Sequence, residues 1–147
     1  MIGLKEMKGS FFDAPKVVRA VDKATRRVLS KFGAYVRTAA KSSIRKRKKA
    51  SAAGCPPSSH TGLLKKFIFF GYDTATRSVV IGPIRLNSTD GTAPAALEYG
   101  GMTRITTRRK GPRITVSAKI VSRPFMHPAL QKELPKLPAT WADSIKP

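Results

Sequence analysis

Apolar residues recur at steps of three and four from Asp13 to about Lys46, and this repeat is the strongest constraint on the fold. The repeat consists of Val18, Val21, Thr25, Val28, Phe32, either Tyr35 or Val36, Ala39 and Ser43. Such spacing places its members on one face of an α-helix. Asp13 and Pro15 are typical of a helix start, because a carboxylate caps the first turn and proline is tolerated there. The sequence therefore predicts one helix over residues 13–46, roughly 50 Å long at 1.5 Å per residue.

The opposite face of this predicted helix is basic. Its cations are Lys16, Arg19, Lys23, Arg26, Arg27, Arg37, Lys41 and Arg45. The face continues into the run Arg45, Lys46, Arg47, Lys48 and Lys49. Gly33 lies inside the helix, where glycine costs ~1 kcal/mol relative to alanine. We therefore expect a kink or a close packing contact at Gly33.

Turn-forming residues divide the remaining chain into short segments. Residues 1–12 form a lead-in, and residues 47–62 combine cations, small residues and two prolines, which favours a mobile loop. Residues 124–147 contain a short helix over 129–134, which Pro135 is expected to stop, and a tail without a strong period. The length of 147 residues suits a single domain built from these segments.

Residues 63–121 are expected to form a small sheet made of hairpins. Short apolar runs at 67–72 and 77–82 are separated by turn residues, which indicates a first hairpin. Residues 103–108 and 113–121 alternate β-branched and basic residues, which indicates a second hairpin with one cationic face. The predicted fold class is α+β: a long N-terminal helix on a small, mostly antiparallel sheet, followed by a short C-terminal helix.

The charge balance narrows the class of function. The chain has 29 Lys and Arg against eight Asp and Glu, a formal net charge of +21. Such self-repulsion is typical of a chain held against a polyanion or inside an assembly. No apolar run approaches the ~18 residues of a membrane span, so we expect no membrane partner.

Residue types that carry chemistry are few. His60 and His127 lack the spacing of metal ligands or of a catalytic triad. The single cysteine, Cys55, precedes two prolines in a loop and is interpreted as a passive thiol. The carboxylates form no close pair for acid–base work. We therefore expect no enzyme, no catalytic residues, no metal and no cofactor.

The basic runs are candidates for contact with DNA or another polyanion. They comprise Arg45, Lys46, Arg47, Lys48 and Lys49, together with Arg108, Arg109 and Lys110. Each Lys or Arg that contacts a phosphate releases a counterion, which favours binding. The alternative interpretation is that each run is a solvated loop that aids solubility. The aromatics Phe67, Phe69, Phe70 and Tyr72 could stack on bases, but their apolar strand favours burial in the core.

Four local patterns, taken in order, point to a family. They are Pro56-Pro-Ser-Ser-His-Thr-Gly-Leu-Leu-Lys65, Val79-Val-Ile-Gly-Pro83, Ala96-Leu-Glu-Tyr-Gly100 and Arg123-Pro-Phe-Met-His-Pro-Ala-Leu130. The set resembles the minor tail, or neck (tail-completion), component family of long-tailed bacteriophages and prophages. The resemblance covers roughly residues 14–138.

This resemblance implies an α+β subunit of a ring at the head–tail junction, in a neck, tail-completion or tail-terminator role around the DNA channel. Its implied partners are further copies in a hexamer or dodecamer, the head–tail connector and tail proteins, and non-specifically the genomic DNA. The implied location is the virion, after synthesis in the bacterial host cytoplasm. The alternative is a sequence-independent nucleic-acid-binding protein, such as a ribosomal or nucleoid protein.

Two of the patterns are candidates for a structural contact between distant segments of the chain, which we call the joint. The residues concerned are Glu98, Tyr99, Gly100, Arg123, Pro124, Phe125 and Met126. Glu98 is one of few acids, so Arg123 is a possible ion-pair partner; the alternative is two independent surface charges. Phe125 and Met126 are expected in the core.

Overall fold

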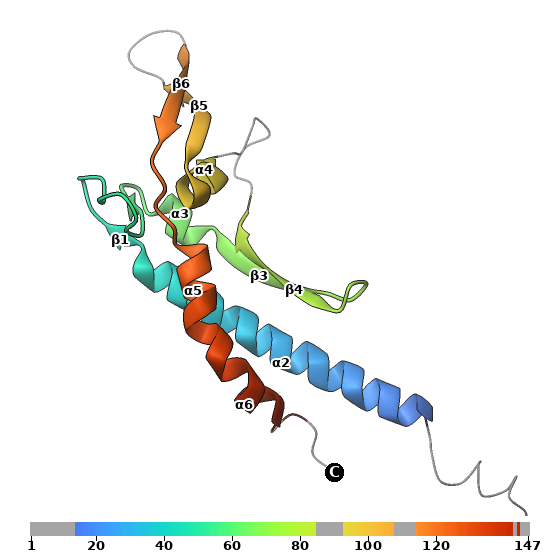
Figure 1. Ribbon diagram of the computed structural model, residues 1–147. Helices are drawn as coiled ribbons and strands as arrows, with labels where there is room; N and C mark the ends of the chain where they lie inside the picture. Colours follow the sequence, from blue (N-terminus) through green and yellow to red (C-terminus); the bar gives the residue numbers. More distant parts are fainter. Residues whose placement is uncertain (1–13, 85–92, 108–113, 143, 145–147) are drawn as a thin grey trace, which may run out of the picture.

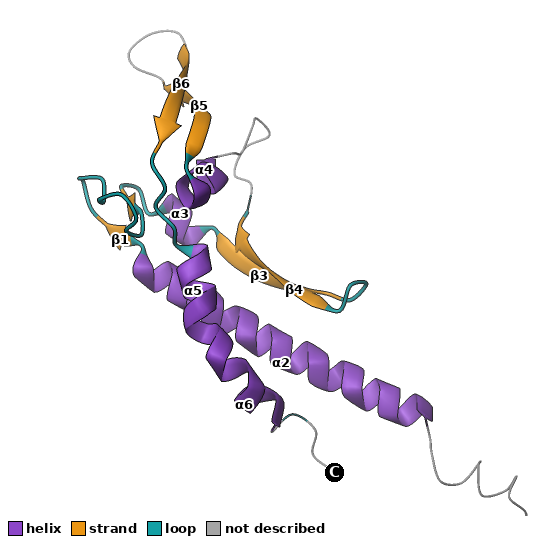
Figure 2. Ribbon diagram, viewed as in Figure 1, coloured by secondary structure: helices purple, strands orange, loops and turns teal. Residues whose placement is uncertain are grey.

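A single long helix, α2 (Ala14–Ser43), is the element against which a β-hairpin and the C-terminal helices pack (Figure 1). The computed structural model describes residues 14–84, 93–107, 114–142 and 144. Helices and strands occupy separate segments of the chain, which confirms the predicted α+β class with a long N-terminal and a short C-terminal helix (Figure 2). None of the described helices is both long and apolar enough to cross a membrane.

Helix α2 ends at Ser43, so the prediction that it reaches Lys46 is wrong. The hydroxyl groups of Ser42 and Ser43 donate back to the carbonyls of Ala39 and Ala40, a local alternative to the helical pattern. Ile44 then turns into the core, and the next two residues become strand β1 (Arg45–Lys46). The expected cap, Asp13, lies outside the described residues.

Strand β1 pairs in parallel with β2 (Ser58–Ser59), within the segment that was expected to be a mobile loop. The amide of Gly54 donates to the Ser122 carbonyl at 2.9 Å, and the amide of Gly62 donates to Ser59 Oγ at 2.9 Å. The Gly54 contact ties the loop to a distant part of the chain, whereas the Gly62 contact is local. Its mobility stays a prediction. A single turn, α3 (Leu63–Lys66), follows.

The first hairpin forms as predicted, from β3 (Ile68–Asp73) and β4 (Ser78–Pro83). Asp73 Oδ1 accepts from the Ala75 amide at 2.9 Å and fixes the turn. Strand alternation places Ile68 inside the core and turns Phe69 outward. The expectation that all four aromatics of this region are buried is therefore wrong for Phe69, whose side chain is 41% exposed.

The second hairpin, β5 (Gly101–Thr107) with β6 (Ile114–Ile120), projects away from α2 (Figure 1). It contacts the short helix α4 (Ala93–Tyr99) at its base. In the described residues the strands form three separate two-stranded sheets, not the single small sheet that was expected.

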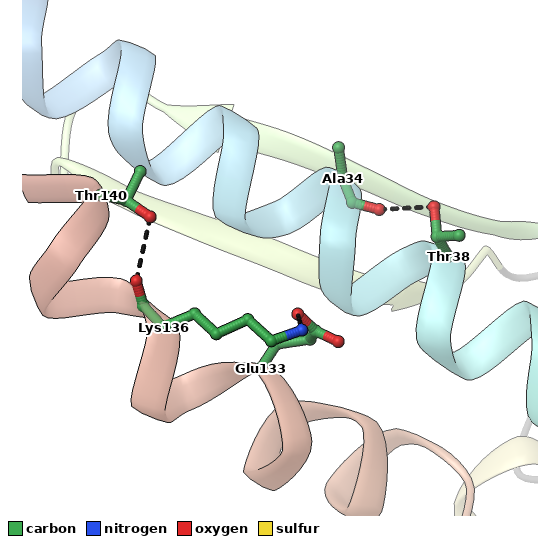
Figure 3. A network of polar contacts seen from close by, with 5 residues as sticks. All are labelled: Ala34, Thr38, Glu133, Lys136 and Thr140. Carbon is green, nitrogen blue, oxygen red and sulfur yellow. Dashed lines mark hydrogen bonds and ion pairs between the residues drawn. The ribbon is translucent and has the colours of Figure 1, made fainter.

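The C-terminal region is more helical than predicted. Helix α5 (Met126–Glu133) leads through the 3₁₀ turn η1 (Leu134–Lys136) into α6 (Leu137–Ala142). Helix α5 ends at Glu133, before Pro135, as predicted, although it begins at Met126 and not at Ala129. The chain continues as η1, whose first turn tolerates Pro135 because no backbone N–H is needed there. Both helices contact α2, and Figure 3 shows Lys136 reaching Glu133 at 2.7 Å within this region.

The core lies where these elements meet α2. Its buried members are Phe32, Val36, Ala40, Ile44, Ile68, Phe125 and Ala129. The predicted apolar face is thus correct at Val28, Phe32 and Val36, which are buried. It is wrong at Val18 and Val21, which are exposed because the buried positions of α2 begin only at Ala24. Of the two alternatives Tyr35 and Val36, Val36 is buried and Tyr35 is exposed.

Gly33 marks close packing between α2 and the first hairpin. A Cβ atom at this position would lie 2.7 Å from Val79 Cγ2 and 2.9 Å from Phe70 Cδ2. Alanine normally stabilises a helix interior by ~1 kcal/mol relative to glycine. Here we expect Gly33→Ala to lower the free energy of unfolding by about 1–3 kcal/mol, because the hairpin must shift. Urea denaturation measures this change.

The double variant Gly33→Ala/Val79→Ala is the control. Removing the Val79 methyl groups relieves the nearest contact. The penalty of Gly33→Ala should therefore be smaller in the Val79→Ala background than in the wild type. A Gly33→Ala protein more stable than the wild type would contradict the packing account.

Candidate functional site

The predicted joint is real, and its centre is the side chain of Glu98. Glu98 Oε2 accepts from the amides of Phe125 at 2.9 Å and Met126 at 3.0 Å, and Oε1 accepts from the amide of His127 at 2.8 Å. These amides begin α5, where the first turn leaves N–H groups without helical partners. A negative charge is also favourable at this end of a helix. Glu98, itself on α4, therefore caps α5 from outside.

Arg123 does not pair with Glu98, so the suggested ion pair is wrong. Its Nε donates to the Ser51 carbonyl at 2.9 Å, and its amide donates to the Leu97 carbonyl at 2.6 Å. The carboxylate of Glu98 is already satisfied by the three amides of α5. Arg123 thus joins the loop after β1 to the joint.

Other members of the predicted joint have different places. Phe125 is in the core, and Met126 packs against it half-buried. Gly100 adopts φ 77°, and a Cβ there would lie 3.2 Å from the Ser122 amide nitrogen, so glycine is required for two reasons. Tyr99 is 82% exposed, so its inclusion in the joint is wrong: the end of α4 directs it to the surface. Pro124 is half-buried and links Arg123 to α5.

The joint also contains groups that the sequence did not single out. Ser122 Oγ donates to the Glu98 carbonyl at 2.8 Å, and the Ser51 and Leu97 carbonyls accept from Arg123. Backbone carbonyls leave no signal in a sequence, so only the fold identifies them.

The first basic run is exposed throughout. Arg45 and Lys46 lie in β1, and residues 47–49 follow it at the surface. Arg108, Arg109 and Lys110, at the predicted tip of the second hairpin, lie outside the described residues. The run at 45–49 is therefore accessible to a large partner.

A second basic feature was not expected from the sequence, and we call it the Phe69 cluster: Arg37, Lys41, Lys65 and Phe69. Arg37 Cζ and Lys41 Nζ lie 5.6 and 5.5 Å from the centre of the Phe69 ring, within cation–π range. Arg37 Nε also donates to the Ile68 carbonyl at 3.0 Å. Lys41 Nζ donates to the Lys66 carbonyl at 3.4 Å. Ring and carbonyls together hold both cations in place.

The charges of this cluster repel one another. Partial desolvation, followed by the charges of Arg37 and Lys65, lowers the pKa of Lys41 below its usual value of 10.5. In the described part of the chain no carboxylate forms an ion pair with Arg37, Lys41 or Lys65. The i, i+4 spacing of Arg37 and Lys41 is visible in the sequence, but the position of Phe69 against them depends on the packing of β3.

Groups suited to bind a metal ion are absent from the described residues: no three His, Cys, Asp or Glu side chains gather there. Cys55 is exposed, and His60 lies at the surface of the loop before α3. The arrangement offers anion binding and protein contacts.

Replacing Glu98 tests the cap. In Glu98→Gln one oxygen acceptor becomes an NH₂ donor that faces backbone N–H groups, so at least one buried amide loses its partner. We expect a loss of about 2 kcal/mol in the free energy of unfolding. Glu133→Gln is a matched control, because Glu133 is equally buried but pairs with the exposed Lys136. It should cost less than about 1 kcal/mol. Equal losses in urea denaturation would contradict the capping role.

Replacing Arg37 tests the electrostatics of the Phe69 cluster. Because the charge of Arg37 lowers the pKa of Lys41, Arg37→Gln should raise that pKa towards 10.5. NMR titration of the Lys41 side chain measures the change. Arg26→Gln removes an equal charge from an exposed position of the same helix and should leave Lys41 unchanged. An unaltered pKa in Arg37→Gln would show that the cations do not interact.

No protein-family model, curated protein or solved structure matches this chain. The resemblance to phage neck proteins therefore rests on the residue patterns alone. Two of those patterns, around Glu98 and around Phe125, meet in one joint.

Proposed function

We propose that the chain is a structural subunit of the neck or tail top of a long-tailed phage or prophage particle. In this role it forms a ring at the head–tail junction, around the DNA channel, with connector and tail proteins as neighbours. The role is structural and uses no catalytic group, metal or cofactor.

The observation that carries this proposal is the projecting hairpin β5–β6. In the described residues its two strands have no third strand beside them. A two-stranded hairpin alone is marginal in water, and free strand edges invite pairing with another chain. Met102, Ile114 and Val116 on this hairpin are all more than half exposed. Such a hairpin suits a subunit that neighbouring chains complete.

The joint supports the phage assignment more directly. The patterns Leu97-Glu98-Tyr99-Gly100 and Arg123-Pro124-Phe125-Met126 are the residues that resemble the neck family. They form one unit that fixes the base of the hairpin to α5. The +21 charge is consistent with a channel that carries DNA.

The alternative function is sequence-independent nucleic-acid binding in a ribosomal or nucleoid protein. The exposed run at 45–49 and the Phe69 cluster favour it as well. The exposed apolar hairpin favours the neck subunit, because nucleic-acid contact does not require apolar strands.

Particles from the organism that encodes this chain test the proposal. We expect mass spectrometry to find the chain in purified virions or induced prophage particles, and cryo-electron microscopy to place it in a ring at the head–tail junction. An in-frame deletion should leave filled heads without tails. Recovery of the chain with ribosomes or bulk nucleoid, and not with particles, would favour the alternative.

Two hairpin variants sharpen this test. Val116 and Ser117 are adjacent, exposed, and on opposite faces of β6, because Val116 pairs with Ile105 and Ser117 with Arg104. Val116→Lys should fail to restore tailed particles in the deletion strain, since it charges the apolar face. Ser117→Lys adds the same charge to the polar face and should restore them. If both variants restore tailed particles, the apolar face of the hairpin is not the surface that contacts neighbouring chains.

A further inference from the structure

The Phe69 cluster has the properties of a prepared anion site. Arg and Lys side chains normally lose rotamer entropy when they are fixed. Here the Ile68 and Lys66 carbonyls and the Phe69 ring already restrain Arg37 and Lys41. An anion that binds Arg37 and Lys41 therefore causes a smaller loss of side-chain entropy than an anion that binds unrestrained surface cations.

The charge of the cluster is uncompensated within the described chain. Arg37, Lys41 and Lys65 repel one another, and no described carboxylate pairs with them. A bound anion relieves this repulsion. The chain has only eight acids, so another copy of itself is a poor source of that anion.

The surrounding helix indicates which anion fits. Arg37 and Lys41 belong to the basic face of α2, which begins at Lys16 and includes Arg19, Lys23 and Arg26. From Lys16 to Lys41 this face extends roughly 37 Å at 1.5 Å per residue, about one turn of duplex DNA. A straight array of this length matches an extended polyanion, whereas a short acidic loop would reach only one part of it.

The aromatic ring is not available for base stacking. Its two neighbours, Arg37 and Lys41, lie 5.6 and 5.5 Å from its centre. Phe69 therefore supports the cations and does not read bases. Contacts that reach phosphates alone carry no sequence information.

We propose that the Phe69 cluster binds phosphate groups of duplex DNA without sequence preference. This deepens the proposed function, on which it rests for the choice of DNA as the polyanion. Binding by the purified full-length chain does not depend on particle assembly, so the two proposals fail separately.

The test is a salt titration of binding to two unrelated duplexes. Arg37→Gln/Lys41→Gln should lower the magnitude of the slope of log K against log salt by about 1.8, at ~0.9 per phosphate contact. Its affinity at 0.15 M salt should fall roughly 10- to 30-fold on both duplexes. Urea denaturation of each variant confirms that it is folded.

Two further variants distinguish binding at the Phe69 cluster from binding that depends only on the net charge of the chain. Arg104→Gln/Lys119→Gln removes the same charge from one face of the second hairpin, away from α2. Its slope and affinity should change less than those of the cluster variant. Phe69→Leu keeps every charge but removes the ring, and should weaken binding several-fold with the slope nearly unchanged.

Three results would overturn the proposal. Equal losses of DNA affinity in the two double variants would mean that binding depends on the net charge alone and not on the Phe69 cluster. A strong preference for one duplex would mean base reading. A glutamate-rich peptide that binds more tightly than DNA, with the same dependence on Arg37 and Lys41, would assign the cluster to an acidic protein partner.

Discussion

The hydrogen bonds that the Glu98 carboxylate accepts from the first amides of α5 hold two distant parts of the chain together. Without them the start of α5 would leave buried N–H groups unpaired, at a cost of about 1–3 kcal/mol for each group. The same contact lies beside Phe125, which is in the core, and beside the junction of α4 and β5. The second hairpin projects from this joint, and its strands bury few of their described side chains.

The large positive charge is accommodated by geometry more than by ion pairing. With eight Asp and Glu, ion pairs such as Asp22–Arg77 and Glu133–Lys136 can reach only a minority of the 29 Lys and Arg. The long helix instead keeps its cations opposite the core and spreads them along its length. Where Arg37 and Lys41 come close, carbonyl groups and the face of Phe69 stabilise them. The result is a surface that gains from a polyanionic neighbour.

The two hairpins show how one local pattern leads to two roles. β3–β4 packs on α2 at Gly33 and contributes Ile68 to the core. β5–β6 has a similar alternation but contacts the short helix α4 only at its base, and Ile114 and Val116 stay exposed. In the first case the side-chain pattern stabilises the monomer. In the second it leaves apolar side chains exposed, and our proposal assigns this surface to neighbouring chains.

The sequence alone determined the elements that depend on local spacing: the long helix, both hairpins and the two segments of the joint. It also indicated a kink or a close contact at Gly33, and the structure shows the close contact. Tertiary structure decided what each element touches. Glu98 meets amides and not Arg123, Tyr99 faces outward, Phe69 supports cations, and the strands form separate sheets. The physical reason is that periodicity is a property of neighbouring residues, whereas these contacts join distant segments through backbone groups that all residues share.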